Sequence, residues 1–284
     1  MRRDKALSAL MITLFAFLLL TTIGCQSGPE EDAPKPGDAE LAWLQENYPA
    51  LDAKRAELND VRARLAGDVP EEEATPDGEG GDGAEGGEGG DGEGGEAAPP
   101  MTPEELEAKA TALQAEIESM TEDVGAKVVE YLNAAEISVG SEYTPEQQYA
   151  IDIKIKEDIL IAQEYIRQGG DYGRALEIYS GSRQLDMDHP DLLAAIEEAE
   201  TLRYMTEERF KLAKKNMTQD EIRENLGQVK HSNVRDYEDQ GVQAWFYKKE
   251  DGGAAGVFFK KKGGEWKVYK LDFKAAERQV EEGE

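Results

Sequence analysis

The sequence predicts an α+β protein, with an N-terminal coiled-coil or helical hairpin, an α-helical middle and a small C-terminal domain of one helix and a three-stranded antiparallel sheet. Two observations lead to this prediction. Apolar residues recur in steps of three and four through residues 39–66, 102–135 and 144–215, which is the spacing of a helix with one buried face. Between Val242 and Phe273 the pattern changes to aromatic-rich runs separated by pairs of glycines, as in an antiparallel meander.

The first 24 residues have the features of a secretory signal peptide. Three basic side chains within the first five residues precede an uncharged run from Ala6 to Leu20, and small residues follow. A basic start, an apolar core and a small-residue cleavage site are typical of exported proteins. An uncleaved membrane anchor is the alternative, because the uncharged stretch before Glu30 is just long enough to span a bilayer.

The segment Thr22-Ile23-Gly24-Cys25 resembles the bacterial lipobox. The resemblance implies cleavage before Cys25 and a diacylglycerol group on its thiol, so that residues 25–38 form a tether. Gln26, in place of an aspartate, resembles the signal for transfer to the outer membrane. The implied location is the periplasmic face of the bacterial outer membrane, and an inner-membrane anchor facing the periplasm is the alternative. Because Cys25 is the only cysteine, no internal disulfide is expected.

The chain is strongly acidic, with a formal net charge of −29 and a pI of about 4.4. Proteins that bind nucleic acid present a basic surface to the phosphates, so we expect no nucleic-acid partner. Residues 71–100 contain eleven acidic residues, eleven glycines and no aromatic or branched aliphatic side chain. Such a segment buries too little apolar surface to offset its ordering entropy, which predicts a disordered linker over residues 67–101.

Two amphipathic helices are predicted on either side of this linker, over residues 39–66 and 102–135. The first contains Pro49, so it is either one kinked helix or a short helix followed by a longer one. The second begins at Thr102-Pro103-Glu104-Glu105, which is the pattern of a capping box with proline at the first helical position. Their apolar seams contain Leu41, Leu44, Tyr48, Leu51, Leu58 and Leu65 in the first helix and Leu106, Ala110, Leu113, Ile117, Met120, Val124 and Tyr131 in the second.

The two seams can bury each other in an antiparallel hairpin within one chain. Segments close in the sequence have a high effective concentration for each other, so we favour this arrangement. The alternative is that each seam pairs with another chain and forms an oligomer. Arg55 and Arg62 occupy two seam positions of the first helix, which makes its seam the weaker of the two.

Residues 144–215 are predicted to be helical, with a capping-box pattern at Thr144–Gln147 and a last helix from Asp191 to about Lys215. The central part resembles one tetratricopeptide repeat in Gly170, Asp171, Tyr172, Ala175, Leu176 and Tyr179, and departs from it at Gln163, Ile166 and Met187. The resemblance implies a helix–turn–helix unit that binds proteins or peptides, with Tyr172 and Tyr179 as partner contacts. Plain helical scaffolding is the alternative, since arrays normally need three repeats.

The C-terminal domain is predicted over residues 216–275 and an acidic tail over 276–284. Thr218 and Glu221 complete a capping-box pattern, and Gly227 ends the short helix. The run Met-Thr-x-x-Glu-Ile-x-x-x-Leu-Gly, ahead of a polar connection and a meander, resembles the small lipoproteins of the SmpA/OmlA (BamE) type. That resemblance implies a binding domain at the inner surface of the outer membrane and suggests a setting in envelope assembly.

Three strands are expected in this domain, at Val242–Lys248, Ala255–Lys261 and Glu265–Phe273. Side chains alternate between the two faces of a strand. In the last strand, Trp266 and Val268 are therefore predicted on one face, and the opposite face receives Tyr269, Leu271 and Phe273.

Eight lysines lie between Lys248 and Lys274, against four acidic residues. A basic face on an acidic protein can meet anionic lipid headgroups or an acidic partner. Lysines on an exposed strand also protect a sheet edge from aggregation, and both interpretations stay open. For a face that binds a partner, the predicted contacts are Lys248, Lys260 and Lys262.

No group of residues in the sequence converges on a catalytic mechanism. His189 and His231 are the only histidines, neither has a second histidine at metal-ligand spacing, and Cys25 is assigned to the lipid. Residues 180–182 lack the Gly-x-Ser-x-Gly frame of a nucleophile elbow. We therefore expect no enzymatic activity, no metal and no cofactor.

Together these observations predict a non-catalytic, lipid-anchored periplasmic adaptor or scaffold that binds one or more envelope proteins at the outer membrane. The alternative is a structural spacer of the cell envelope, in which the coiled segments oligomerise and the acidic linker holds layers apart. A third hypothesis is a hydrolase, with a general acid–base pair among the abundant carboxylates.

Overall fold

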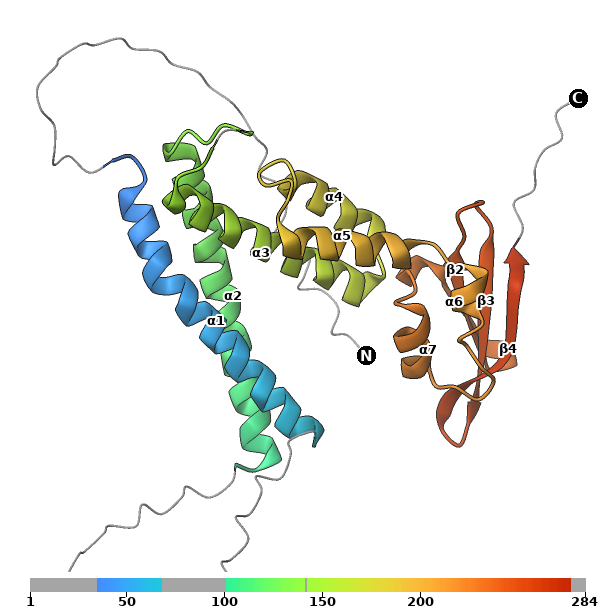
Figure 1. The fold of residues 1–284 in the computed structure, drawn as a ribbon. Helices are drawn as coiled ribbons and strands as arrows, with labels where there is room; N and C mark the ends of the chain where they lie inside the picture. The colour runs from blue at the N-terminus through green and yellow to red at the C-terminus, as the bar shows by residue number, and fades with distance from the viewer. Residues whose placement is uncertain (1–34, 68–100, 141, 277–284) are drawn as a thin grey trace, which may run out of the picture. The chain divides into compact units, whose positions relative to one another are not determined.

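A computed structural model describes residues 35–67, 101–140 and 142–276 (Figure 1). Within them the fold is α+β, with seven α-helices followed by a four-stranded antiparallel sheet. The predicted signal peptide with Cys25, nearly all of the predicted linker and nearly all of the acidic tail lie outside the described residues.

Helices α1 (Asp38–Ala66) and α2 (Pro103–Ala134) pack against each other as an antiparallel hairpin (Figure 1). Gly37, just before α1, lies against the ring of Tyr131 near the end of α2, where a Cβ atom would come within 2.9 Å of Cδ2. α1 runs through Pro49 without interruption, so of the two predicted alternatives the structure has the single helix. The two seams are therefore buried within a single chain.

The buried seam of the hairpin differs from the prediction near the end of α1. Leu65 is exposed, with 37% of its surface accessible, whereas Val61 is buried. Val61 follows Leu58 by three residues and belongs to the same apolar core of the hairpin. The buried seam of α1 therefore ends at Val61, one turn before the predicted Leu65.

Helices α3 (Pro145–Gly169), α4 (Tyr172–Ser182) and α5 (Pro190–Arg203) form the helical middle. Gly170, which joins α3 to α4, has a φ of 61°, and a Cβ atom there would come within 2.4 Å of the Val229 carbonyl oxygen. The turn therefore requires glycine. The shared core of the three helices contains Ile151, Ile155, Ile159, Ala162, Tyr172, Ala175, Tyr179, Leu192, Ala195 and Ala199.

The last helix of this region is shorter than predicted, since it ends at Arg203 and not near Lys215. Thr206 begins a separate short helix, α6 (Glu207–Phe210), by accepting a hydrogen bond from the Arg209 amide at 3.2 Å. The Arg209 guanidinium donates to three carbonyl oxygens at and just after the end of α5, those of Thr201, Leu202 (3.1 Å) and Tyr204 (2.7 Å). These side-chain hydrogen bonds take the place of the helical backbone bonds that are missing between α5 and α6. The spacing of apolar residues in the sequence gives no sign of them.

The C-terminal sheet has four strands in the order β1-β2-β3-β4, so the predicted three-stranded sheet is wrong by one strand. The additional strand, β1, lies in the predicted polar connection between two short 3-10 helices, η1 (His231–Asn233) and η2 (Glu238–Gln240). It is an edge strand with only its first residue half-buried, so its sequence shows no apolar alternation. The strands are β1 (Val234–Tyr237), β2 (Val242–Lys248), β3 (Ala254–Lys262) and β4 (Glu265–Ala276).

A bulge between β3 and β4 changes the predicted faces of β4. Phe258 pairs with Lys270, but the next residue of β3 pairs with Val268, so Tyr269 is the extra residue. A bulge of this kind shifts the alternation of side chains by one position. Residues that were predicted on opposite faces of β4 therefore pack in one apolar core. These residues are Trp266 and Val268 from one predicted face and Leu271 and Phe273 from the other.

A buried ion pair joins the hairpin to α3. The Arg55 guanidinium of α1 donates to both carboxylate oxygens of Glu157, at 2.7 and 2.8 Å, and to the Thr121 hydroxyl of α2 at 3.1 Å. The Glu157 side chain is 8% exposed and that of Arg55 is 20% exposed. Burial alone would lower the pKa of Arg55, but the hydrogen bonds and the charge of Glu157 hold it above its usual value. The arginine in the predicted seam is thus matched by a carboxylate.

We expect Glu157→Ala to lower the free energy of unfolding by about 2–3 kcal/mol, because it leaves a largely buried guanidinium without its carboxylate. Glu116→Ala removes the partner of Lys54 from an exposed ion pair between α1 and α2 and should cost no more than about 0.5 kcal/mol. Urea unfolding followed by circular dichroism measures both variants. Equal losses would contradict the assigned role of the Arg55–Glu157 pair.

Candidate interaction surfaces

A pocket of about 220 Å³ lies between α3, α4 and α5, and we call it the helical pocket. Its lining is mostly apolar, while its polar members are exposed side chains that form a rim. The apolar lining consists of Ile166, Ala195, Ala199 and Leu202 with the rings of Tyr172 and Tyr179, and the rim consists of Gln163, Arg167 and Glu198.

The two tyrosines that were predicted as partner contacts form walls of the helical pocket. Tyr179 is 1% exposed and Tyr172 is 7% exposed, and burial raises the pKa of both hydroxyls. The Tyr172 hydroxyl accepts a hydrogen bond from the Gln228 amide at 2.9 Å. This bond ties α4 to the segment that follows α7 (Gln219–Leu226). A ligand that enters the helical pocket contacts both rings.

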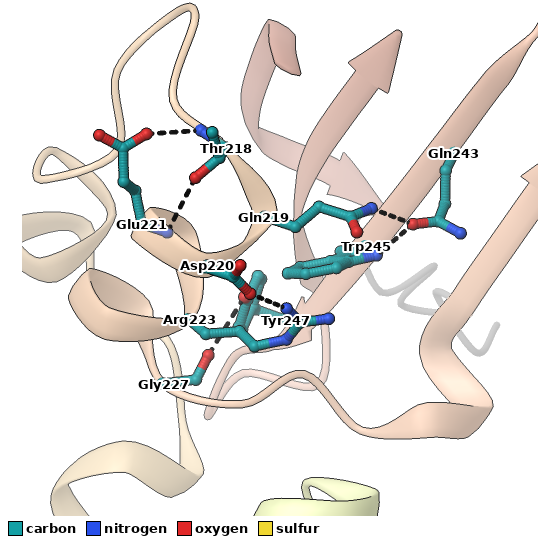
Figure 2. A network of polar contacts seen from close by, with 9 residues as sticks. All are labelled: Thr218, Gln219, Asp220, Glu221, Arg223, Gly227, Gln243, Trp245 and Tyr247. Atoms are coloured by element: carbon teal, nitrogen blue, oxygen red, sulfur yellow. Dashed lines mark hydrogen bonds and ion pairs between the residues drawn. The ribbon is translucent and has the colours of Figure 1, made fainter. Parts of the chain in front are cut away.

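α7 packs on one face of the sheet, here called the inner face. Figure 2 shows the polar contacts that join this helix to the sheet. Gln219 of α7 donates to the Gln243 side-chain oxygen, which also accepts from the Trp245 indole at 3.0 Å. The Tyr247 hydroxyl donates to the Gly227 carbonyl oxygen at 3.2 Å, and burial raises its pKa. The indole and phenol thus keep hydrogen-bond partners inside an apolar core.

The opposite, outer face of the sheet carries a row of aromatic rings and lysines. The Phe246 and Phe258 ring centroids are 6.0 Å apart, and those of Phe258 and Tyr269 are 6.5 Å apart. The Lys260 ammonium lies 5.0 Å from the Tyr269 ring centroid, and the Lys270 ammonium lies 4.9 Å from that of Phe258. We call this surface the open sheet face, and it consists of Phe246, Phe258, Lys260, Lys262, Tyr269 and Lys270.

The three predicted contact lysines are not gathered at one point. Lys260 pairs with Val242 at the start of β2, whereas Lys248 ends that strand, so that the two lie roughly 20 Å apart along the sheet. The Lys248 ammonium lies 5.3 Å from the Tyr204 ring centroid. Lys260 and Lys262 are two residues apart on β3 and share the outer face. The aromatic row and Lys270 were not predicted as contacts, because the bulge that brings Tyr269 beside them is hidden in the sequence.

The histidines and acidic residues do not assemble a metal site in the described ranges, where no group of three metal-binding side chains comes together. His189 is buried as the cap of α5, and its Nδ1 accepts from the Leu192 amide at 3.4 Å. His231 lies in η1. None of the described helices combines the length and the apolar character needed to cross a membrane.

No protein-family model, no curated protein and no solved structure matches this chain. The chemistry of the helical pocket and of the open sheet face is therefore the basis on which we infer function.

The capping box of α7 makes a contribution to stability that depends on pH. The Thr218 amide donates to the Glu221 carboxylate at 2.6 Å, and the Glu221 amide donates to the Thr218 hydroxyl at 3.3 Å (Figure 2). The hydrogen bond from the Thr218 amide lowers the pKa of Glu221. A lowered pKa in the folded state gives stability that is present above the unfolded value of about 4.3 and is lost as the pH falls through the folded value.

We expect Glu221→Gln to be less stable than the wild type at pH 6, because it lacks the charge-assisted bond, and this difference should shrink toward pH 3. The unfolding midpoint in urea, measured for both proteins at each pH, tests this expectation. A difference that stays constant over that pH range would argue against a contribution of the Glu221 charge.

Proposed function

We propose that this protein is a non-catalytic, lipid-anchored adaptor that binds other envelope proteins on the periplasmic side of the bacterial outer membrane. The observation that carries the proposal is the helical pocket, which has an apolar lining and a polar rim. Interfaces between proteins are commonly centred on one aromatic or aliphatic side chain that fills a desolvated pocket and is surrounded by a polar rim.

The size of the helical pocket favours a protein ligand over a small molecule. Its volume of about 220 Å³ lies below the ~300–1,000 Å³ that is typical of sites for drug-sized ligands. It is far larger than the ~30 Å³ that one water molecule occupies in the liquid. A single apolar side chain of a partner fits this space, and Arg167 and Glu198 at the rim can pair with polar residues beside it.

The finer assignments of the fold belong to the same proposal. The α3–α4 pair would be one unit of the tetratricopeptide type, with Ala175 fully buried where the helices approach and α5 closing the groove. Helix α7 with its capping box and the sheet would be a domain of the SmpA/OmlA (BamE) type. The additional strand β1 differs from the three-stranded pattern that was expected for this type. Both likenesses support a binding function at the envelope.

The membrane anchor in this proposal rests on the sequence around Cys25, because that segment lies outside the described residues. The alternative of an oligomeric spacer needs the seams of α1 and α2 to be free for another chain. Within the described hairpin these seams bury each other, which favours the adaptor.

Filling the helical pocket should abolish partner binding and leave the fold intact. Ala195 belongs to the core of the three helices and also lines the pocket, so Ala195→Leu extends the side chain into the space of the pocket. We expect the proteins captured from native envelopes with the wild-type chain, and identified by mass spectrometry, to be lost with this variant.

The matched control for this experiment is Ala194→Leu, which makes the same change at an exposed position of the same helix. It should retain the captured proteins. If both variants capture the same partners as the wild type, the helical pocket is not the binding site.

Cys25→Ser should release the protein from the membrane. Without the thiol no acyl chain can be attached, and the chain should move to the soluble fraction after cell disruption and a wash at high salt. A variant that stays with the membranes after this wash would contradict the lipid anchor and leave the pocket hypothesis untouched.

A further inference from the structure

The open sheet face presents positive charge that is not neutralised by the described part of the chain. Of the lysines along β3 and β4, Lys267 pairs with Glu265 at 3.1 Å and Lys270 pairs with Asp272 at 3.2 Å. Lys260 and Lys262 form no ion pair with a carboxylate among the described residues, and the Lys262 ammonium donates to the Asn216 side-chain oxygen at 3.5 Å. The unmatched charge is therefore concentrated at one end of β3.

The positions of Lys260 and Lys262 on β3 have the same spacing as side chains on one side of an extended ligand. Lys260 and Lys262 are alternate residues of one strand, and both project from the outer face. Alternate residues of a strand are separated by about 6.6–6.8 Å, which is also the repeat of side chains on one side of an extended peptide. A peptide that lies along β3 can thus place alternate carboxylates opposite the two lysines.

The aromatic row continues this surface along β3 toward β2. Phe258 precedes Lys260 by two residues on the same face, and its ring is half-buried between Phe246 and Tyr269. An apolar side chain of the ligand, two residues before its first carboxylate, would lie over this row. The face therefore has an apolar end and a cationic end.

We propose that the open sheet face binds an extended acidic polypeptide segment of a partner protein, with an apolar residue followed by acidic residues at alternate positions. This surface is separate from the helical pocket, so the inference goes beyond the adaptor function that is proposed for that pocket. Recognition combines charge-assisted pairing at Lys260 and Lys262 with contact of an apolar side chain over Phe258.

A polypeptide fits this face better than an anionic bilayer does. Proteins that bind membrane interfaces insert protruding apolar side chains among the lipids. Here the Phe246 and Phe258 rings are half-buried, lysine ammonium groups lie over Phe258 and Tyr269, and Tyr269, the most exposed ring of the face, is 38% exposed. A bilayer also has no fixed side-chain spacing that would match alternate lysines.

The test uses the full chain in detergent and two fluorescent peptides of identical composition. One has the order Thr-Leu-Thr-Glu-Thr-Glu-Thr, and the other is an isomer in which the two glutamates are adjacent and lie before the leucine. Fluorescence anisotropy should show that the first peptide binds roughly fivefold more tightly, because only it can match the alternate lysines and the aromatic row together.

The double variant Lys260→Gln, Lys262→Gln should weaken binding of the first peptide roughly tenfold, since it removes both charge pairs. The matched control is Lys211→Gln, Lys215→Gln, which removes the same charge from exposed positions outside the sheet and should change binding less than about twofold. Tryptophan fluorescence reports whether each variant keeps the core around Trp245. If the double variant does not fold, Lys260→Gln alone is tested in its place, and it should weaken binding of the first peptide by a smaller factor.

Three results would overturn the inference. The first is equal affinity for the two peptide isomers, and the second is unchanged binding by the folded double variant. The third is binding to phosphatidylglycerol vesicles that the double variant loses, with no binding of either peptide, which would assign the face to a lipid surface. In each case the Ala195→Leu experiment still decides the helical pocket independently.

Discussion

The fold depends on one constraint, which is that each helix and strand has an apolar face that another element must cover. α1 and α2 cover each other, α3 to α5 share one core, and α7 covers the inner face of the sheet. In the part of the chain that the structure describes, the Lys260 and Lys270 ammonium groups lie over two rings of the outer sheet face. Long lysine side chains can lie along apolar surface and keep their charge in water. They make this face soluble and still leave it open to a ligand.

A charged side chain in an apolar seam is stable only when its charge is matched. Arg55 meets this condition by reaching Glu157 of α3 and Thr121 of α2 at the same time. Only one register of the three helices brings these groups together, so the pair restricts how the hairpin meets the helical middle. The arginine that weakens the first seam as an apolar surface therefore adds specificity to the packing. This is the contribution to be expected of a buried ion pair, since its net effect on stability is often small.

The sequence correctly predicted the features that depend only on neighbouring residues. The capping boxes at Thr102, Thr144 and Thr218 are all present, because each needs only residues three positions apart. The strand β1 and the end of α5 were missed, since the first has almost no buried side chain and the second is set by the Arg209 side chain. Of the residues that line the helical pocket, only Tyr172 and Tyr179 were predicted as partner contacts. Of the open sheet face only Lys260 and Lys262 were predicted as contacts. Its aromatic row could not be predicted, because strand register and bulges depend on contacts between distant residues.

An acidic protein can bind an acidic segment because charges act over short distances in salt. At physiological ionic strength the Debye length is about 8 Å, so carboxylates farther away than this have little effect on a ligand at the sheet, whereas lysines in contact with it act strongly. The internal pairs of Lys267 and Lys270 leave the charge at Lys260 and Lys262, at one end of β3. With Phe258 before them on the same strand, an apolar contact and a charged contact lie in a fixed order. The order of side chains along the ligand, more than its net charge, then determines which segments bind.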